Sequence, residues 1–546
     1  MLFKEKLKTM PKGRLWDEYC GFLDLELSEF MEIQFRLLDE QISIFAASEL
    51  GKSIMKDAKP ENVEEFRKMV PLTKYEDYQN VLLNRHEEML PGKPLVWLET
   101  TWESGSRPVK TAPYTREMLD VYTRNVISAM ILSTSTEKGK FNVEPDAKAF
   151  YGLAPLPYAT GLFPILVAGE MDFRFMPSLK DAESLSFSQQ QKAGFKLAVK
   201  KGLDQFFGMS SIVYAITKNF GEYTKSSGFG LSGLAGMSPR MLYRIIKAKY
   251  QSKRDKREIQ PKDLFKLKGF VAVGTDTAMF KDELEEAWGM KPLEIHGGTE
   301  TCCLATETWS RDGLVFFPDT AFYEFIPVSE VLRNEEDPSY VPNTYLMDEV
   351  CANTEYELVL TIFKGGAFMR YRPGDIYRCL RTGNDKDHLK LPQFEYVDRV
   401  PSVIDIAGFT RITRRSIDRV IQMSGLPVGD WFACKEYDGN KCSFMHLYAE
   451  IDSSSEQSLF LTEKLVIEHM SAYFRHYDHD FNDLKRLLGR EPLEVTILPE
   501  GTIRSYEEKI GRNIRRINPS GSDIIDIRNT AGGVFSRGGE SFVLSK

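Results

Sequence analysis

Four short segments of the chain combine glycines, hydroxyls, carboxylates and cations in a way that suits a nucleotide. The first covers residues 103–110 and contains Ser104, Gly105, Ser106 and Lys110. Such small residues let backbone N–H groups and hydroxyls surround phosphate oxygens, while a lysine balances the negative charge. Taken alone, the segment is better explained as a plain Ser/Gly turn. Its meaning therefore depends on the three segments further along the chain.

The second and third segments each come directly after an apolar run that predicts a strand. They read Gly274-Thr275-Asp276 and His296-Gly297-Gly298-Thr299-Glu300. In an open α/β sheet such loops project from the carboxyl edge, where ligands bind. The glycines permit close approach of a flat ligand, and Glu300 carries the kind of oxygen that Mg²⁺ prefers. As isolated turns, both segments would carry little information.

The fourth segment ends in Tyr371-Arg372-Pro373-Gly374-Asp375 and is the sharpest single signal. A tight turn presents Asp375 so that its two oxygens can accept hydrogen bonds from both hydroxyls of a ribose. Further along, Asp398-Arg399 lies where a domain junction is expected. There Arg399 could touch ribose or phosphate in one arrangement of the domains.

The elements that must carry these segments are predicted from the periodicity of the apolar residues. Helices are predicted over about the first 90 residues. Strand, helix and strand then succeed one another at residues 269–274, 277–288 and 293–296, which indicates a largely parallel sheet. Residues 314–318, 322–326 and 356–363 are expected to form an antiparallel layer, because polar and apolar residues alternate in the last of them.

We therefore predict an α/β protein with a large N-terminal domain, in which parallel and mixed sheets are flanked by helices, and a smaller C-terminal α+β domain. A chain of 546 residues exceeds what one hydrophobic core normally supports. The predicted boundaries are 1–399 for the large domain, 400–530 for the small domain and 531–546 for a flexible glycine-rich tail.

Composition excludes several classes of function. The chain has 42% hydrophobic and 27% charged residues, as a soluble globular protein does. Its net charge of −8 gives no global attraction to nucleic acid or to an anionic membrane, so neither is expected as a partner, although a local basic face stays possible. No apolar run reaches the roughly 18 to 20 residues of a membrane span. The N-terminus lacks an apolar signal core and the cysteines show no disulfide pattern, so a cytoplasmic protein is expected.

Two further features are interpreted as solvated surface. The basic segment 240–268 is read as a helix face in water rather than a docking surface. His469, His476 and His479 lack the spacing of metal ligands on a helix and are read in the same way.

The ordered set of segments resembles the acyl-activating, adenylate-forming superfamily. Its phosphate loop, its Tyr-Gly-x-Thr-Glu motif (here 296–300), its Tyr-Arg-x-Gly-Asp motif (here 371–375) and its Gly-Arg hinge (here Asp398-Arg399) occur in the same order. Residues 70–78 and 317–327 are similar, more particularly, to the plant auxin-responsive acyl acid-amido synthetases and their bacterial relatives.

The resemblance implies an enzyme that uses ATP and Mg²⁺ to turn a carboxylic acid into an acyl-adenylate and then transfers the acyl group to an amine, such as an amino acid. Two alternatives stay open, namely transfer to CoA, as in phenylacetate:CoA ligase-like relatives, and a nucleotide-binding homologue that has lost adenylation. The implied catalytic residues are Glu300, which would also hold the metal, Arg399 and Arg516. The implied nucleotide-binding residues are Ser104, Gly105, Ser106, Lys110, Gly274, Thr275, Asp276, His296, Gly297, Gly298, Thr299 and Asp375.

The acid itself is expected between residues 153–162 and the strand ends at Gly274 and His296. Loops that mix proline, glycine and aromatic residues often line apolar pockets, although a packed core loop explains this segment equally well.

Departures from the family pattern keep the last alternative open. Glu103 brings a carboxylate into or beside the phosphate loop, where it would repel a triphosphate unless it points away or shares Mg²⁺. Many relatives supply a lysine from the C-terminal domain. The nearest match here offers Arg516, which keeps the charge but is not an equivalent donor.

Overall fold

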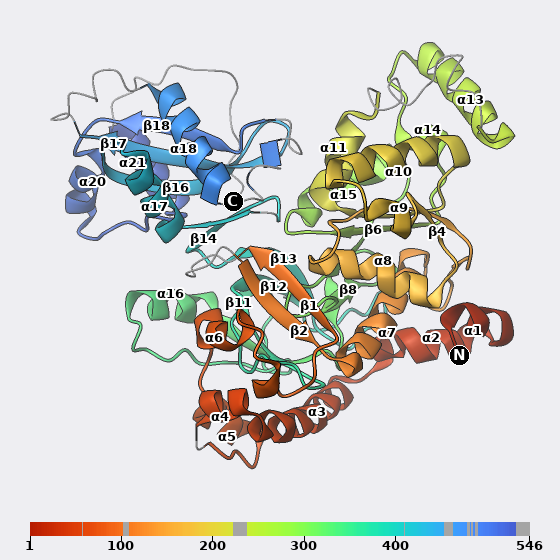
Figure 1. Ribbon diagram of the computed structural model, residues 1–546, viewed down its shortest axis with the longest axis horizontal. Helices are drawn as coiled ribbons and strands as arrows, with labels where there is room; N and C mark the ends of the chain where they lie inside the picture. The colour runs from red at the N-terminus through yellow and green to blue at the C-terminus, as the bar shows by residue number, and fades with distance from the viewer. Residues whose placement is uncertain are drawn as a thin grey trace. The chain divides into compact units, whose positions relative to one another are not determined.

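The computed structural model describes residues 1–56, 58–101, 109–221, 237–408, 410–452, 462–477, 481, 484–485 and 490–530 (Figure 1). These residues fall into two units. Unit 1 contains residues 1–100 and 110–397, and unit 2 contains residues 101–109 and 398–546. Several positions singled out in the sequence lie outside the described residues, namely Glu103, Ser104, Gly105, Ser106, His479 and the predicted tail 531–546.

The sequence segment expected to be helical opens unit 1. Its helices are α1 (Phe3–Thr9), α2 (Lys12–Cys20), α3 (Leu27–Ala47), α4 (Glu49–Met55), α5 (Val63–Met69) and α6 (Gln79–Leu82). Two buried glutamines, two turns apart on α3, fasten this layer to the rest of the unit. The Gln34 amide donates to the carbonyls of Pro318 and Ala321, and the Gln41 amide donates to the carbonyl of Gly366. Backbone groups that would otherwise be buried without partners are thereby satisfied.

An eleven-stranded mixed sheet forms the centre of unit 1, in the order β10-β11-β12-β13-β9-β8-β7-β6-β5-β3-β4. The bounds are β3 (Lys148–Gly152), β4 (Arg174–Met176), β5 (Gln205–Met209), β6 (Gly269–Val273), β7 (Leu293–His296), β8 (Ala305–Glu307), β9 (Leu314–Phe316), β10 (Ala321–Pro327), β11 (Thr354–Ile362), β12 (Asp375–Arg381) and β13 (Gln393–Arg399). The run from β4 to β7 is parallel, and β7-β8-β9 and β10-β11-β12 are antiparallel. The predicted α/β class is confirmed.

Helices cover both faces of the parallel half. They are α7 (Arg116–Ser133), α8 (Ala159–Glu170), α9 (Leu179–Ala182), α10 (Phe187–Lys201), α11 (Ser210–Lys218), α13 (Pro239–Asp255), α14 (Pro261–Leu264) and α15 (Thr277–Trp288); α16 (Val328–Glu336) follows β10. Figure 1 shows α7 and α8 on one side of these strands and α10, α11 and α15 on the other. Such double cover explains why β5 is buried along its whole length.

Aromatic side chains pair across the neighbouring parallel strands and help to hold them in register. Phe150, Phe206 and Phe270 pair across β3, β5 and β6, with ring centroids 5.0 and 5.5 Å apart, and Trp288 of α15 packs on Phe270 at 5.8 Å. The helix ends at Gly289, whose φ of +73° suits the residue that terminates a helix, as predicted. Because these strands are parallel and in register, their carboxyl ends lie along one edge of the sheet.

Strand β11, which contains the alternating residues 356–362, is buried over that whole stretch. The pairing of β10 with β11 is antiparallel as predicted, but β11 is buried on both faces from Tyr356 to Ile362. Its polar side chains have partners inside the protein. Glu357 pairs with Arg372, and the Thr361 hydroxyl accepts a hydrogen bond from the Arg370 backbone N–H. Polar residues in this strand therefore mark internal contacts and not a solvent face.

Unit 2 is smaller and mixes strands with helices. Its strands are β14 (Val403–Ile406), β15 (Thr410–Thr413), β16 (Val428–Tyr437), β17 (Ser443–Ile451) and β18 (Leu493–Leu498), and its helices are α17 (Arg414–Ser424), α18 (Glu463–Tyr477), α20 (Thr502–Ile510) and α21 (Gly521–Thr530). One core lies under α17 and α18 and a second under α20 and α21. In the described part of the chain, no helix is both long and apolar enough to cross a membrane. All seven cysteines are free thiols.

Candidate active site

A buried cluster joins three of the four predicted segments within unit 1. The Lys110 ammonium lies 2.8 Å from the Glu300 carboxylate and 3.2 Å from the Tyr371 hydroxyl, which in turn donates to Glu300 at 2.9 Å. Lys110 is carried by β2 (Val109–Tyr114), which pairs with β1 (Val96–Thr101). The end of the first segment, the third segment and the fourth segment thus converge on one ion pair.

The loop that carries Glu300 is a tight hairpin between β7 and β8. Its base is closed by the Leu304 N–H donating to the His296 carbonyl, and its tip by the Gly298 N–H donating to the Thr301 carbonyl. A side chain at Gly297 would place a Cβ atom 2.3 Å from the Cys302 carbonyl oxygen, so only glycine fits there.

The tip of this hairpin is also held from β2. The Tyr114 hydroxyl donates to the Thr299 carbonyl at 2.8 Å. Burial raises the pKa of Tyr114 well above its ordinary value, which keeps the hydroxyl protonated as a donor. Strand β2 therefore fixes both the ion-pair partner of Glu300 and the backbone next to it.

A second cluster brings His296 and Asp375 together. The His296 ring hydrogen bonds through Nδ1 to the Tyr377 hydroxyl and packs against the Tyr396 ring at 4.5 Å between centroids. The Tyr396 hydroxyl donates to Asp375 at 3.4 Å. His296 at the end of β7 and Asp375 at the start of β12 are thus linked through one aromatic ring. Sequence reasoning missed both tyrosines, since they lie within strands and outside the motifs.

The turn before Asp375 is held by its two arginines. Arg370, at a φ of +46°, makes two hydrogen bonds to Glu324, and Arg372 pairs with Glu357 at 2.6 Å. Both pairs are buried, and Gly374 takes a φ of +84° that favours glycine. The arginines are therefore structural supports that fix the position of Asp375.

The second predicted segment lies at the same edge of the sheet. Gly274 follows β6 with a φ of +132°, and its carbonyl accepts a hydrogen bond from the Thr277 hydroxyl. Ser210, directly after the neighbouring strand β5, hydrogen bonds to the same threonine at 2.6 Å. Thr275 and the buried Asp276 complete the turn into α15. Because β5, β6 and β7 are parallel neighbours, these residues share the carboxyl edge with His296.

Behind His296, a buried lysine braces strand β7. Lys281 of α15 lies 2.7 Å from Glu294 of β7 and 2.6 Å from Glu307 of β8. The second carboxylate oxygen of Glu307 accepts a hydrogen bond from the Glu294 backbone N–H. Burial raises the pKa of Glu294, against the opposing charge of Lys281 and with the added effect of Glu307. Two carboxylates and one ammonium thus fix the strand from which the hairpin starts.

The described residues around Glu300 do not fit a magnesium site. Mg²⁺ favours several oxygen ligands, whereas Glu300 already faces an ammonium and a tyrosine hydroxyl. Within the described ranges, no group of three or more histidine, cysteine, aspartate or glutamate side chains could hold a metal ion. The metal role of Glu300 remains a prediction that these contacts do not support.

The two arginines predicted from the hinge and the C-terminal domain lie in unit 2. The Arg399 backbone N–H donates to the Asp398 carboxylate, which also lies 3.5 Å from the ammonium of Lys435. Arg516 is held between Glu507 at 2.7 Å and Asp430 at 2.9 Å. Its charge is neutralised by those carboxylates. Roles for Arg399 and Arg516 in catalysis stay predictions.

Residues 153–162, predicted to border the acyl substrate, lie against the hairpin of Glu300. The Cys302 thiol contacts the carbonyl oxygen of Ala159 at 3.7 Å, and the Thr160 hydroxyl donates to the carbonyl of Ala154. A Cβ atom at Gly161 would lie 2.2 Å from the backbone of Leu156, so this loop folds tightly on itself. The loop thus contacts the hairpin that carries Glu300, and its place beside the acyl substrate stays a prediction.

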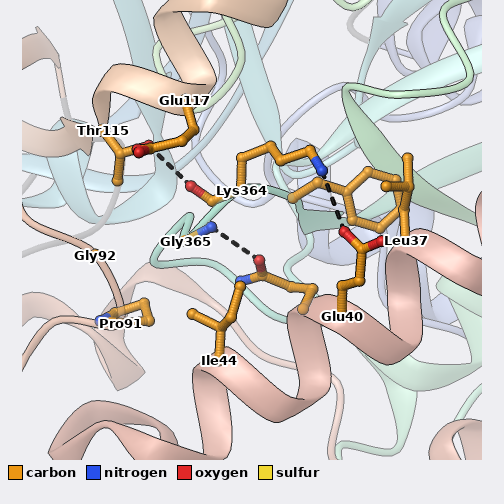
Figure 2. Close-up of a pocket in the computed structure, with 11 residues that line it drawn as sticks. Leu37, Glu40, Ile44, Pro91, Gly92, Thr115, Glu117, Lys364 and Gly365 are labelled. Atoms are coloured by element: carbon orange, nitrogen blue, oxygen red, sulfur yellow. Dashed lines mark hydrogen bonds and ion pairs between the residues drawn. The ribbon is translucent and has the colours of Figure 1, made fainter.

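A pocket of about 290 Å³ lies elsewhere in unit 1 and includes none of the predicted site residues. Figure 2 shows its lining from α3, from the start of α7 and from residues 363–365. Within it the Lys364 ammonium lies 3.2 Å from Glu40, and the Gly365 N–H donates to Gln41. Its polar groups already bond to one another, so we assign it no role in the chemistry.

Two solved ligases share the fold described above. The structure is similar to that of "AtGH3.15 acyl acid amido synthetase in complex with 2,4-DB", at 15% identity over 94% of this chain and 95% of that one, with a TM-score of 0.52. It is also similar to 2-hydroxyisobutyryl-CoA ligase in complex with 2-HIB-AMP and CoA, at 15% identity over 89% and 92%, with a TM-score of 0.56. At such identity the likeness shows the fold.

Sequence comparison adds matches to one family. Residues 21–151 match the GH3 family N-terminal domain, and residues 314–399 match the GH3 family central domain. The chain is 32% identical over 138 residues to the probable indole-3-acetic acid-amido synthetase GH3.9 of Oryza sativa subsp. japonica. The matched stretch covers 23% of this chain and 28% of the relative. The chain is also 32% identical over 91 residues to the probable indole-3-acetic acid-amido synthetase GH3.11 of the same organism, and this stretch covers 16% of this chain and 14% of the relative. The predicted resemblance to the auxin-responsive amido synthetases is confirmed.

Proposed function

We propose that the chain is an ATP-dependent ligase that activates a carboxylic acid as an acyl-adenylate and transfers the acyl group to an amine, with an amino acid as the acceptor class. The observation that carries this proposal is the convergence of Lys110, Glu300 and Tyr371, next to the His296 and Asp375 cluster, at the carboxyl edge of one sheet. Ligands of open α/β folds bind at that edge.

In the first step a carboxylate oxygen of the acid forms a bond to the α-phosphorus of ATP, and the bond to the pyrophosphate leaving group breaks. In the second step the acceptor nitrogen attacks the acyl carbon, loses a proton and displaces AMP. Neither step needs a covalent bond to the protein. What the protein must supply is positioning and compensation of negative charge.

The described residues suit these tasks. Asp375, fixed by its turn and by Tyr396, can accept hydrogen bonds from the ribose hydroxyls. Residues 296–299 offer a flat, glycine-lined strand end for the adenine. Lys110 brings positive charge to the edge where the phosphates would lie, and Glu300 and Tyr371 hold its ammonium in place.

Transfer to CoA is the second candidate. It is favoured by the likeness in fold to 2-hydroxyisobutyryl-CoA ligase, whose TM-score of 0.56 exceeds the 0.52 of the amido synthetase. The amide-forming reaction is supported instead by the matches to the two GH3 domains, which are matches in sequence.

The test is ATP–pyrophosphate exchange with the full chain and a panel of carboxylic acids. We expect exchange that depends on one class of acid and that Lys110→Met abolishes, while Lys93→Met on the exposed surface retains it. Incubation of the active acid with amino acids or CoA then identifies the acceptor by mass spectrometry of the product. Absence of exchange, together with normal AMP binding, would instead support a nucleotide-binding homologue that has lost adenylation.

A further inference from the structure

Helix α13 presents an unusual outer face. Its inner side is apolar, since Met241, Ile245 and Ala248 are almost fully buried. Tyr243, Ile246 and Tyr250 point the other way, with 65%, 60% and 69% of their surface exposed. Spacings of three and four residues place these three side chains on one stripe of the helix. A soluble protein rarely exposes two tyrosines and an isoleucine side by side without a use for them.

Basic residues surround this stripe. The helix carries Arg240, Arg244, Lys247, Lys249, Lys253 and Arg254 against the single acid Asp255. Asp255 pairs with its neighbour Arg254 at 2.7 Å, which leaves the excess of positive charge on the rest of the helix. A chain with a net charge of −8 has therefore gathered strong positive charge on one helix.

The neighbouring helix α10 is also rich in lysine. Helix α10 carries four lysines and no acid, and its end meets the start of α13, where the Ser238 N–H donates to the Lys200 carbonyl at 3.1 Å. Lys192, Lys196 and Lys200 recur every four residues and so share a face of α10. Together the two helices hold ten basic residues and one acidic residue.

The outer face of α13 is also rigidly presented. Arg244 donates to the Leu264 carbonyl of α14 at 3.1 Å, and Met241 packs at the end of α10 beside Gly202. Figure 1 shows α13 at the outer side of unit 1, beyond α14. The helix is thus anchored by its inner side, and its exposed stripe is available to another surface.

We propose that the outer face of α13 is a docking surface for an anionic lipid membrane. Lysine and arginine side chains are attracted to negative headgroups and can extend their charged ends toward them, while tyrosine rings settle at the boundary with the acyl chains. The exposed Ile246 favours a membrane over single-stranded nucleic acid as the partner. A branched aliphatic side chain is stabilised by burial in the apolar part of a bilayer. Single-stranded nucleic acid is bound by aromatic rings that stack on bases and by cations that contact phosphates, and an isoleucine provides neither contact.

This surface lies outside the nucleotide site, so the inference does not depend on the proposed reaction. The net negative charge of the chain opposes binding of the whole molecule to polyanions only at long range. Within about 10 Å, the screening length at moderate salt, the basic residues of α13 and α10 determine the attraction.

The test is co-sedimentation of the full chain with vesicles of phosphatidylcholine alone and of phosphatidylcholine mixed with phosphatidylserine. We expect binding to the anionic vesicles only, and binding that weakens as sodium chloride is added. The triple variant Tyr243→Ser/Ile246→Ser/Tyr250→Ser and the charge variant Lys247→Glu/Lys253→Glu should each lower the partition coefficient by about tenfold or more.

Matched variants elsewhere on unit 1 serve as controls. Leu95→Ser/Val341→Ser removes exposed apolar side chains, and Lys8→Glu/Lys59→Glu reverses exposed charges; both should bind and melt like the wild type. Equal binding to neutral and anionic vesicles, no binding at all, or α13 variants that bind like the controls would overturn the proposal. Tighter binding to single-stranded RNA than to vesicles at the same salt would also overturn it and reassign the surface.

Discussion

The ammonium of Lys110 lies 2.8 Å from the carboxylate of Glu300, and both side chains are almost wholly buried. Removing one partner leaves a buried charge without compensation. We expect Lys110→Met to lower the free energy of unfolding by about 3–5 kcal/mol. The double variant Lys110→Met/Glu300→Gln should lose less than the sum of the two single changes, because the unpaired charge is then gone. Urea unfolding of the four proteins measures this; additive losses would show that the two groups act independently.

Asp375→Ala should weaken nucleotide binding without unfolding the turn. A hydrogen bond to a charged group typically contributes about 1.5–3 kcal/mol, so the dissociation constant for AMP should rise about tenfold or more. Isothermal titration calorimetry provides the measurement. Asp385→Ala, a change at an exposed aspartate beyond β12, is the control and should bind like the wild type. Unchanged affinity in Asp375→Ala would remove this residue from the site.

The buried Glu294 should make stability depend on pH in a defined direction. Its pKa is raised by burial above its ordinary value of 4.5, so the unfolded chain releases the proton at lower pH than the folded protein does. As the pH rises above about 4.5, the free energy of unfolding of the wild type therefore decreases, and this decrease ends once Glu294 is ionised in the folded protein as well.

Glutamine at this position has no proton to release. The melting temperature of Glu294→Gln should accordingly rise relative to that of the wild type as the pH increases above about 4.5. Thermal unfolding at half-unit steps of pH follows this difference, and the exposed Glu286→Gln on α15 should show none. A difference that falls with rising pH would mean that pairing with Lys281 outweighs burial.

Variants of Arg516 can distinguish a structural role of this residue from a catalytic one. Because its guanidinium bridges Glu507 and Asp430, Arg516→Ala should destabilise unit 2 and leave two carboxylates facing each other. If the role is structural, Arg516→Lys should recover most of the stability and pyrophosphate exchange should follow the folded fraction. Loss of exchange in a fully folded Arg516→Lys protein, judged by its melting curve, would instead support catalysis.

Much of the parallel half of the sheet could be predicted, because its strands and helices carry local signals. Helix α15 begins and ends where the sequence placed it, with Gly289 as its terminator, and β6 and β7 lie at their predicted runs. The adjacency of Gly274 and His296 could be predicted from strand order alone, since loops after neighbouring parallel strands share an edge.

What could not be predicted depends on contacts between distant residues. Gln34 and Gln41 look like ordinary polar positions on α3, yet both are buried because backbone groups some 280 to 330 residues away need partners. The burial of Glu357 in β11 depends in the same way on a distant residue, because Arg372 from another segment pairs with its carboxylate. A single sequence does not show which distant residue will neutralise a buried charge.

The backbone of the hairpin between β7 and β8 is closed by hydrogen bonds of its own. Both of its ends belong to strands paired in register, with His296 opposite Ala305, and its internal hydrogen bonds close within residues 296–304. Another segment of the same length could therefore be exchanged here without altering the register of the sheet, provided that it keeps glycine at 297, Glu300 as the partner of Lys110, and the carbonyl that receives the Tyr114 hydroxyl.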